Sequence, residues 1–243
     1  MITLKQALTH SNNAISARLI YELGPKALVN KMRMFGVTGY LEASLPLSLG
    51  TADVPVKEMV SAYTTFSNKG LKVDPIFVTR IEDNQGNIIY SAAPHRPEVT
   101  SEAAYWKILT MLMSVVDSGT GSSLRGKYGV RAQMGGKTGT TNSNSDAWFI
   151  GFTPDLVTGV WVGGEERYIH FNTMAYGQGA RAALPVYGYY MKSVYDDAKL
   201  PYSQQTRFQF PGDFELCEGE LKVTGEGEFG QGNEEETSEG IFD

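Results

Sequence analysis

The chain has 243 residues, 42% of them hydrophobic and 20% charged, a composition typical of a soluble globular protein with one large domain or two small ones. Its formal net charge of −6 argues against nucleic acid as the main partner. The acidity is concentrated in residues 213–243, where eleven acidic residues accompany one basic residue, Lys222. We therefore expect a folded domain over 1–212 and a disordered, acidic, Gly- and Glu-rich tail over 213–243.

The sequence carries few signals for a cellular compartment. Cys217 is the single cysteine and cannot form an internal disulfide. No apolar run approaches the ~20 residues that span a bilayer. Residues 1–5 lead directly into an amphipathic pattern instead of a signal peptide. From these residues alone, we expect the chain to stay where it is made.

The first third of the chain is predicted to be helical. Apolar side chains at helical spacing predict four helices, over residues 3–10, 14–23, 25–35 and 56–68. Ser11-Asn12-Asn13 separates the first predicted helix from the second, and Gly24-Pro25 separates the second from the third. Glycines and prolines across 37–54 predict a loop.

The remainder alternates strands and helices. A β-hairpin is expected over 76–91 with its turn at 83–86, and a long helix is expected to start at 100–102 and end near Asp117. Three strands over 131–140, 146–152 and 157–163 and a last helix over about 180–196 follow. This order predicts an α+β fold in which an antiparallel sheet packs against helices.

A cluster of small and polar residues opens the first of these three strands. Gly135 and Gly136 remove side chains just before Lys137, so a ligand or another backbone can approach closely. Lys137 would attract a carboxylate, and Thr138 and Thr140 would place hydroxyl groups on one face of the strand. Free N–H groups at the strand edge could support an oxyanion. The alternative is that Lys137 is a solvated surface residue.

The Ser11-Asn12-Asn13 segment allows two interpretations. Ser and Asn are favoured N-caps, and Ala14 opens the next predicted helix, so the segment could simply cap it. The functional interpretation places the Ser11 hydroxyl and the Asn13 amide in a tight interhelical loop that faces a cleft.

Together the two motifs resemble those of a known family. Ser-x-Asn in an interhelical loop, followed much later by Lys-Thr-Gly on a strand, is similar to the penicillin-binding transpeptidases and serine β-lactamases. Three stretches resemble the bifunctional class A penicillin-binding proteins in the same order: ITLKQALTHSNNAISARLIYELG, VPVKEMVSAYTTFSNKG and GGKTGTTNSNSDAWFIGFTPDLVTGVWVG. The resemblance covers about residues 1–200.

This resemblance implies a peptidoglycan D,D-transpeptidase. In that family a serine attacks the penultimate D-alanine carbonyl of a stem peptide, releases the terminal D-alanine, and passes the acyl group to an amine; β-lactams imitate the substrate. By position, the family's carboxylate-binding stretch corresponds to Lys137, Thr138, Gly139 and Thr140, with the Thr140 N–H in the oxyanion hole. Ser11 would pass a proton and Asn13 would hold a substrate amide. The resemblance implies no metal or other cofactor.

The family's nucleophile lies in a Ser-x-x-Lys motif upstream of Ser-x-Asn, and none of the serines in these 243 residues has lysine three positions later. We therefore expect residues 1–212 to be a partial transpeptidase domain, with the nucleophile helix, a glycosyltransferase domain and a membrane anchor upstream. Such a portion should be inactive alone. It should also expose a sheet edge, so self-association is expected. The parent protein would work outside the cytoplasmic membrane.

Two other functions remain open. The first is a non-catalytic module that binds stem peptides or a protein partner in a cleft at Lys137. The second is a relative of the β-lactamases, which ranks lower because DAWFIGFTP resembles the transpeptidases and because β-lactamases also need the serine.

Overall fold

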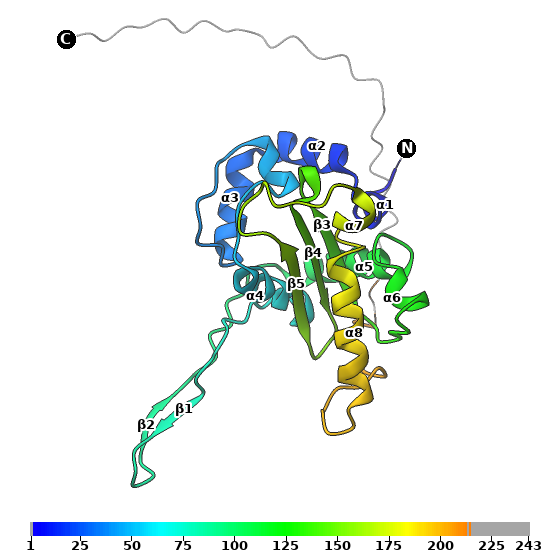
Figure 1. Cartoon of the computed structure of the whole chain (residues 1–243). Coiled ribbons are helices and arrows are strands. Elements are labelled where there is room, and N and C mark those ends of the chain that lie inside the picture. Colours follow the sequence, from blue (N-terminus) through cyan, green and yellow to red (C-terminus); the bar gives the residue numbers. More distant parts are fainter. Residues whose placement is uncertain (1, 213, 215–243) are drawn as a thin grey trace, which may run out of the picture.

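A three-stranded antiparallel sheet organises the fold, and the computed structural model describes residues 2–212 and 214 (Figure 1). Strands β3 (Gly135–Thr140), β4 (Asp146–Phe152) and β5 (Val157–Gly163) follow one another in the chain and pair in that order. β3 and β5 are therefore the two edges of the described sheet. The hairpin turns between them are short, which is the usual connection for antiparallel neighbours.

Helices precede, interrupt and follow these strands. Before the sheet lie α1 (Leu4–Thr9), α2 (Asn13–Leu23), α3 (Pro25–Met34), the 3-10 helix η1 (Leu45–Leu49), α4 (Val56–Ser67), α5 (Glu102–Asp117) and α6 (Ser123–Gly126). A short turn, η2 (Asn142–Asn144), joins β3 to β4, and α7 (Met174–Gly177) and α8 (Ala183–Asp196) close the domain.

The sheet lies between α4 and α8. A Cβ placed on Gly159 of β5 would meet Val60 of α4 at 2.6 Å, whereas a Cβ on Gly151 of β4 would meet Tyr187 of α8 at 2.5 Å. Gly159 pairs with Ile150, the neighbour of Gly151, so the two glycines face opposite sides of the sheet. The absence of side chains at both positions lets the two helices pack directly on the strands.

Two buried clusters hold these layers together. On the α8 side, Phe149 stacks edge-on against Tyr187 with ring centroids 4.8 Å apart. On the α4 side, Phe152 contacts Tyr63 and Phe66, and α5 adds Trp106 to the same cluster. Fully burying one such aromatic side chain stabilises the fold by roughly 1.5–3 kcal/mol, so these contacts contribute substantially to the stability of the sheet.

Local sequence signals explain where the first helices begin. The Thr3 hydroxyl accepts the Gln6 N–H at 3.1 Å while the Gln6 side chain accepts the Thr3 N–H at 2.9 Å, which is a capping box at the start of α1. Pro25 is the first residue of α3, and Gly24 before it has φ of +82°. A residue with a Cβ would be strained at that φ, so Gly24 is suited to the sharp turn between α2 and α3.

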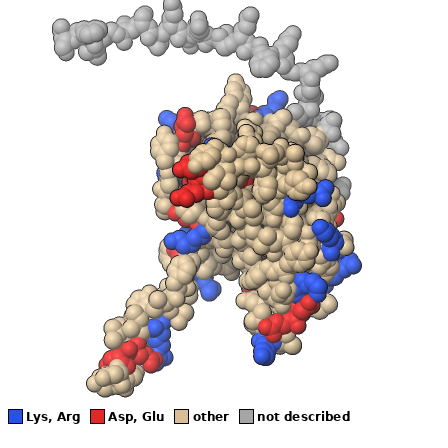
Figure 2. Space-filling view, viewed as in Figure 1, with Lys and Arg blue, Asp and Glu red and all other residues tan. Residues whose placement is uncertain are grey.

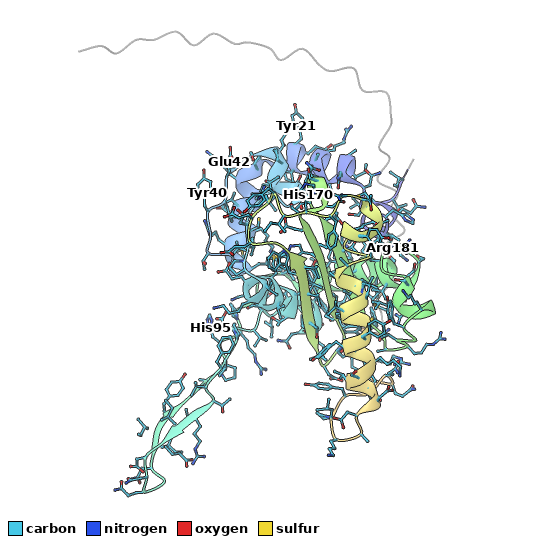
Figure 3. The ribbon with its side chains drawn as sticks, viewed as in Figure 1. Tyr21, Tyr40, Glu42, His95, His170 and Arg181 are labelled. Atoms are coloured by element: carbon cyan, nitrogen blue, oxygen red, sulfur yellow. The ribbon has the colours of Figure 1, made fainter. Side chains whose placement is uncertain are left out.

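A β-hairpin arm, residues 71–99, projects from the body (Figure 1). Its strands are β1 (Arg80–Glu82) and β2 (Ile88–Ser91), and all seven strand residues are exposed. His95 lies at the root of the arm (Figure 3), and its Nδ1 is 2.7 Å from Oδ2 of Asp74. Figure 2 shows a mostly uncharged arm with acidic and basic atoms gathered near the tip.

The predicted fold class is confirmed, and the order of long helices and strands is as expected from the sequence. Differences are local. The regular pairing of β3 begins at Gly135 and not at 131, β1 begins at Arg80, and α8 begins at Ala183. The loop expected over 37–54 contains η1, and the one-turn helices α6 and α7 were not expected, because each is too short to show a helical apolar period.

The predicted acidic tail lies outside the described residues, except for Phe214. Within the described part of the chain, none of the helices combines the length and apolar character needed to cross a bilayer.

Candidate active site

Two glycines let the start of β3 pack directly against the aromatic core. A Cβ on Gly135 would lie 2.5 Å from Cζ of Phe152, and a Cβ on Gly136 would lie 2.9 Å from Cζ of Phe149. Both distances are shorter than a van der Waals contact, so a side chain at either position would displace a buried ring. The strand therefore carries its first side chain at Lys137.

Lys137 connects the two sequence motifs. Its Nζ donates hydrogen bonds to Oγ of Ser11 at 2.8 Å and to the main-chain oxygen of Thr138 at 2.8 Å. Ser11 lies in the turn between α1 and α2, 126 residues earlier in the chain. Lys137 is half-buried and its ammonium is held by two partners, which argues against the alternative of a fully solvated surface lysine.

The environment of Lys137 favours loss of its proton or binding of an anion. Burial lowers the pKa of the Lys137 ammonium from 10.5 to about 8. Its hydrogen-bond partners in the described part of the chain are a hydroxyl and a carbonyl oxygen, and neither carries a charge. A carboxylate arriving from a ligand would restore the charge pairing that a buried ammonium otherwise lacks.

The structure assigns separate positions to the three residues of the Ser11-Asn12-Asn13 segment. Asn12 is the N-cap of α2, with its side chain accepting the Ile15 N–H at 3.2 Å. Ser11 has φ of +55°, which is unusual for a residue with a side chain, and its hydroxyl accepts from Lys137. Asn13 begins α2 and lines the same cavity as Lys137. The capping interpretation therefore holds for Asn12 and not for Ser11.

The two threonines of β3 have fixed hydroxyl partners. The Thr138 hydroxyl lies 2.8 Å from that of Thr120, in the turn after α5, and the Thr140 hydroxyl accepts the Gly179 N–H at 2.9 Å. Because Thr140 accepts through its oxygen, its own hydroxyl proton remains available to donate to a ligand. Thr138 and Thr140 lie on the opposite side of the strand from the base of the Lys137 side chain, by the alternation of β-structure.

The main-chain N–H of Thr140 points to the open edge of the sheet. Thr141 donates its N–H across to Asp146 O at 3.1 Å, so N–H groups alternate and that of Thr140 faces away from β4. The Thr138 oxygen that binds Lys137 lies on the same outer edge. This edge therefore presents a cation and an N–H donor side by side, a combination suited to a carboxylate or an oxyanion.

A cavity of about 700 Å³ adjoins these groups. Its polar wall includes Asn13 and residues 137–143, and its apolar wall comes from α3, η1, α4 and β4. The phenol of Tyr63 also lines it, and burial raises the pKa of Tyr63 to about 12, so the phenol stays protonated. A mostly apolar pocket with a few converging polar groups is the usual form of a ligand site.

Several of these contributors were not predicted from the sequence. Thr120 and Gly179 bond the two threonines, and neither was singled out from the sequence. The structure explains the glycine at 179, because a Cβ there would lie 2.3 Å from the oxygen of Gly139, but the sequence holds no local signal of that contact. In the described residues, no group of three or more His, Cys, Asp or Glu side chains is placed to hold a metal ion.

Comparison with known proteins identifies the family. The family model for the penicillin binding protein transpeptidase domain matches residues 1–183. The chain belongs to this family. The resemblance to class A penicillin-binding proteins predicted from the sequence is thereby confirmed.

Individual relatives of the chain are also penicillin-binding proteins. The chain is 33% identical over 227 residues to penicillin-binding protein 1A of Aquifex aeolicus, covering 90% of this chain and 30% of that protein. It is 36% identical over 169 residues to penicillin-binding protein 2D of Bacillus subtilis, covering 67% of this chain and 24% of that protein. The chain thus spans about a quarter to a third of the length of these relatives.

Solved structures of the family share the fold. The crystal structure of penicillin-binding protein 1A from Haemophilus influenzae superposes with a TM-score of 0.73 at 26% identity, over 86% of this chain and 36% of that chain. The penicillin-binding protein PonA1 from Mycobacterium tuberculosis, solved in complex with penicillin V, has a TM-score of 0.65 at 22% identity, over 87% of this chain and 59% of that chain. At this identity the second comparison speaks for the fold alone.

Proposed function

We propose that this chain provides the substrate-binding and proton-transferring part of a peptidoglycan D,D-transpeptidase site. The hydrogen bond between Lys137 and Ser11 carries the proposal, because it joins the two motifs that the transpeptidases use for these tasks. Family membership and the cavity beside β3 support it. The substrate class is a stem peptide ending in D-Ala-D-Ala, and β-lactams are its mimics.

Each residue has a role in this proposal. The Lys137 ammonium and the Thr138 and Thr140 hydroxyls bind the terminal carboxylate, with Gly139 allowing close approach. The outward N–H of Thr140 stabilises the oxyanion that forms when the D-alanyl carbonyl is attacked. Asn13 holds the substrate amide across the cavity, and Ser11, bonded to Lys137, passes a proton to the leaving amine.

The acyl transfer also needs a nucleophile. We propose that this is the serine of a Ser-x-x-Lys motif, which none of these 243 residues supplies, so the chain alone should bind substrate without turning it over. By the same reasoning, the complete protein would work outside the cytoplasmic membrane, where peptidoglycan is built. Self-association through the open strand edge at β5 is a further part of the proposal.

A second candidate function is a non-catalytic module that binds stem peptides. It is favoured by one observation: the hydrogen-bond partners of the Lys137 ammonium in the described structure are uncharged, so a ligand carboxylate could pair with it without any nucleophile. The two candidates differ only in whether an acyl group is ever transferred.

Carboxylate-dependent binding tests the proposal. The affinity of the chain for a short peptide ending in D-Ala-D-Ala should exceed its affinity for the same peptide with an amidated C-terminus, by calorimetry or NMR titration. Lys137→Ala should abolish the difference, while Lys199→Ala, on the exposed turn after α8, should preserve it. Equal affinity of the wild-type chain for acid and amide would exclude the proposed role of Lys137.

A further inference from the structure

The turn between β3 and β4 forms the rim of the cavity directly after Thr140. Thr141, Asn142, Ser143 and Ser145 all line the cavity. Any shift of this turn would therefore move both a wall of the cavity and the neighbouring N–H donor of Thr140.

This turn contains two residues in the left-handed region, and one of them, Ser143, is of a type that rarely adopts it. Ser143 and Asn144 have φ of +63° and +58°, although neither is glycine. Left-handed conformations of residues with side chains cost of order 1 kcal/mol each and persist only where surrounding contacts impose them. External contacts must hold the turn.

The carboxylate of Asp146, the first residue of β4, supplies three of these contacts. Its Oδ2 accepts from the Thr141 hydroxyl and from the Ser145 hydroxyl, each at 3.0 Å. Its Oδ1 accepts from Trp161 Nε1 on β5 at 2.9 Å. The Asp146 N–H in turn donates to the Thr141 hydroxyl at 2.9 Å. The Asp146 side chain thus links both ends of the turn to strand β5.

The charge state of Asp146 suits this task. Burial by itself would raise the pKa of Asp146, but hydrogen bonds from Trp161, Ser145 and Thr141, together with the charge of Arg167, outweigh it and lower the pKa. The carboxylate is therefore ionised at neutral pH, and hydrogen bonds to an ionised acceptor are about twice as strong as neutral ones.

We propose that Asp146 is a positioning residue of the site, which holds the turn 141–145 so that the hydroxyl and the main-chain N–H of Thr140 both keep their ligand-facing geometry. It acts through Thr141, whose hydroxyl and main-chain N–H are both bonded to Asp146. The inference rests on the proposed function for its ligand, but the hydrogen-bonded turn itself does not depend on that function.

Four variants test the proposal. Asp146→Ala removes all three accepted bonds, and Asp146→Asn keeps an acceptor for Trp161 but cannot accept from both hydroxyls. Trp161→Phe removes only the indole bond. Asp155→Ala is the matched control, because Asp155 is an exposed aspartate in the turn at the other end of β4, and in the described structure its carboxylate accepts no hydrogen bond.

The first measurement is the ratio of affinities for the free-acid and amidated D-Ala-D-Ala peptides. Asp146→Ala should reduce this ratio about tenfold, Asp146→Asn and Trp161→Phe should reduce it less, and Asp155→Ala should leave it unchanged. Because the ratio compares two ligands on one folded protein, a general loss of stability does not alter it. An unchanged ratio in both Asp146 variants would overturn the proposal.

The second measurement needs no ligand. Amide hydrogen exchange at 140–145 should accelerate about tenfold or more in Asp146→Asn and Trp161→Phe, while exchange in α5 stays at the wild-type rate. Unchanged exchange of the turn would overturn the proposal even if Asp146→Ala fails to fold. If the wild-type chain does not distinguish acid from amide, the proposed function fails, and the exchange rates alone decide the role of Asp146.

Discussion

Lys137 Nζ and Ser11 Oγ lie 2.8 Å apart, although 126 residues separate them in the chain. One comes from the edge strand of the sheet and the other from the turn between the first two helices. A lysine bonded to a hydroxyl can exchange a proton with it without large movement, so this contact is the one on which the proposed proton transfer depends.

Replacing Lys137 by methionine should stabilise the fold at pH 7. The folded state lowers the pKa of Lys137 to about 8 from 10.5, so between these pH values the unfolded chain binds more protons. Stability from this group therefore increases as pH rises from 8 to 10.5, and at pH 7 the charged lysine is a net cost. Lys137→Met should raise the free energy of unfolding by ~1–3 kcal/mol at pH 7.

Urea unfolding of both proteins at pH 7 and near pH 10 checks this. The advantage of Lys137→Met should shrink at the higher pH, because the wild-type lysine is then neutral in the folded state and no charge is buried there. The same advantage at both pH values would show that the lysine is not destabilised by its charge.

Ser11 combines an unfavourable backbone with a useful hydroxyl, and two substitutions separate them. Its φ of +55° costs an L-residue energy that glycine does not incur. Ser11→Gly should therefore be more stable than Ser11→Ala by about 1 kcal/mol, although both lack the hydroxyl. Thermal denaturation ranks the two variants, and equal melting temperatures would argue against strain at this position.

A side chain at position 135 should disrupt the packing of β3 against the aromatic core. Its Cβ would meet the Phe152 ring at 2.5 Å, so Gly135→Ala should destabilise the chain by roughly 1–3 kcal/mol. Gly126, the last residue of the short helix α6, is the control, since a Cβ there would have no neighbouring atom within 4 Å. Gly126→Ala should be neutral or slightly stabilising in the same denaturant titration.

Removing the Thr120 hydroxyl should weaken ligand binding indirectly, because Thr120 is not itself proposed to contact the ligand. Thr120→Val deletes the partner of the Thr138 hydroxyl, which lies 2.8 Å away, and frees that hydroxyl to rotate. We expect a loss of roughly three- to tenfold in affinity for the free-acid peptide, in line with a hydrogen bond worth about 0.5–1.5 kcal/mol. Affinity for the amidated peptide should change little, and a parallel loss for both would point to a structural effect.

Much of this site was predictable because its signals are local. Apolar spacing and the break at Gly24-Pro25 identified the first helices, and the glycines before Lys137 identified a crowded strand. The Ser-x-Asn and Lys-Thr-Gly motifs identified the two segments that the structure joins through Ser11 and Lys137.

What escaped prediction depends on long-range packing. The bonds from Gly179 to Thr140 and from Trp161 to Asp146 join segments whose approach is set by the whole sheet. The depression of the Lys137 pKa is likewise a property of burial and not of the Lys-Thr-Gly motif itself. The positive φ of Ser143 was not predicted, because contacts from outside the turn impose it on a residue type that rarely adopts it.

The projecting arm has a consequence for the continuity of the chain. Its strands pair with each other, whereas α1 packs on α5 and α4 packs on the sheet, so the parts before and after the arm interlock in the body. A cut near the exposed turn at 83–86 should therefore yield two pieces that remain associated under native conditions and separate only in denaturant. Opening the backbone there would leave the lining of the cavity, to which both pieces contribute, in register.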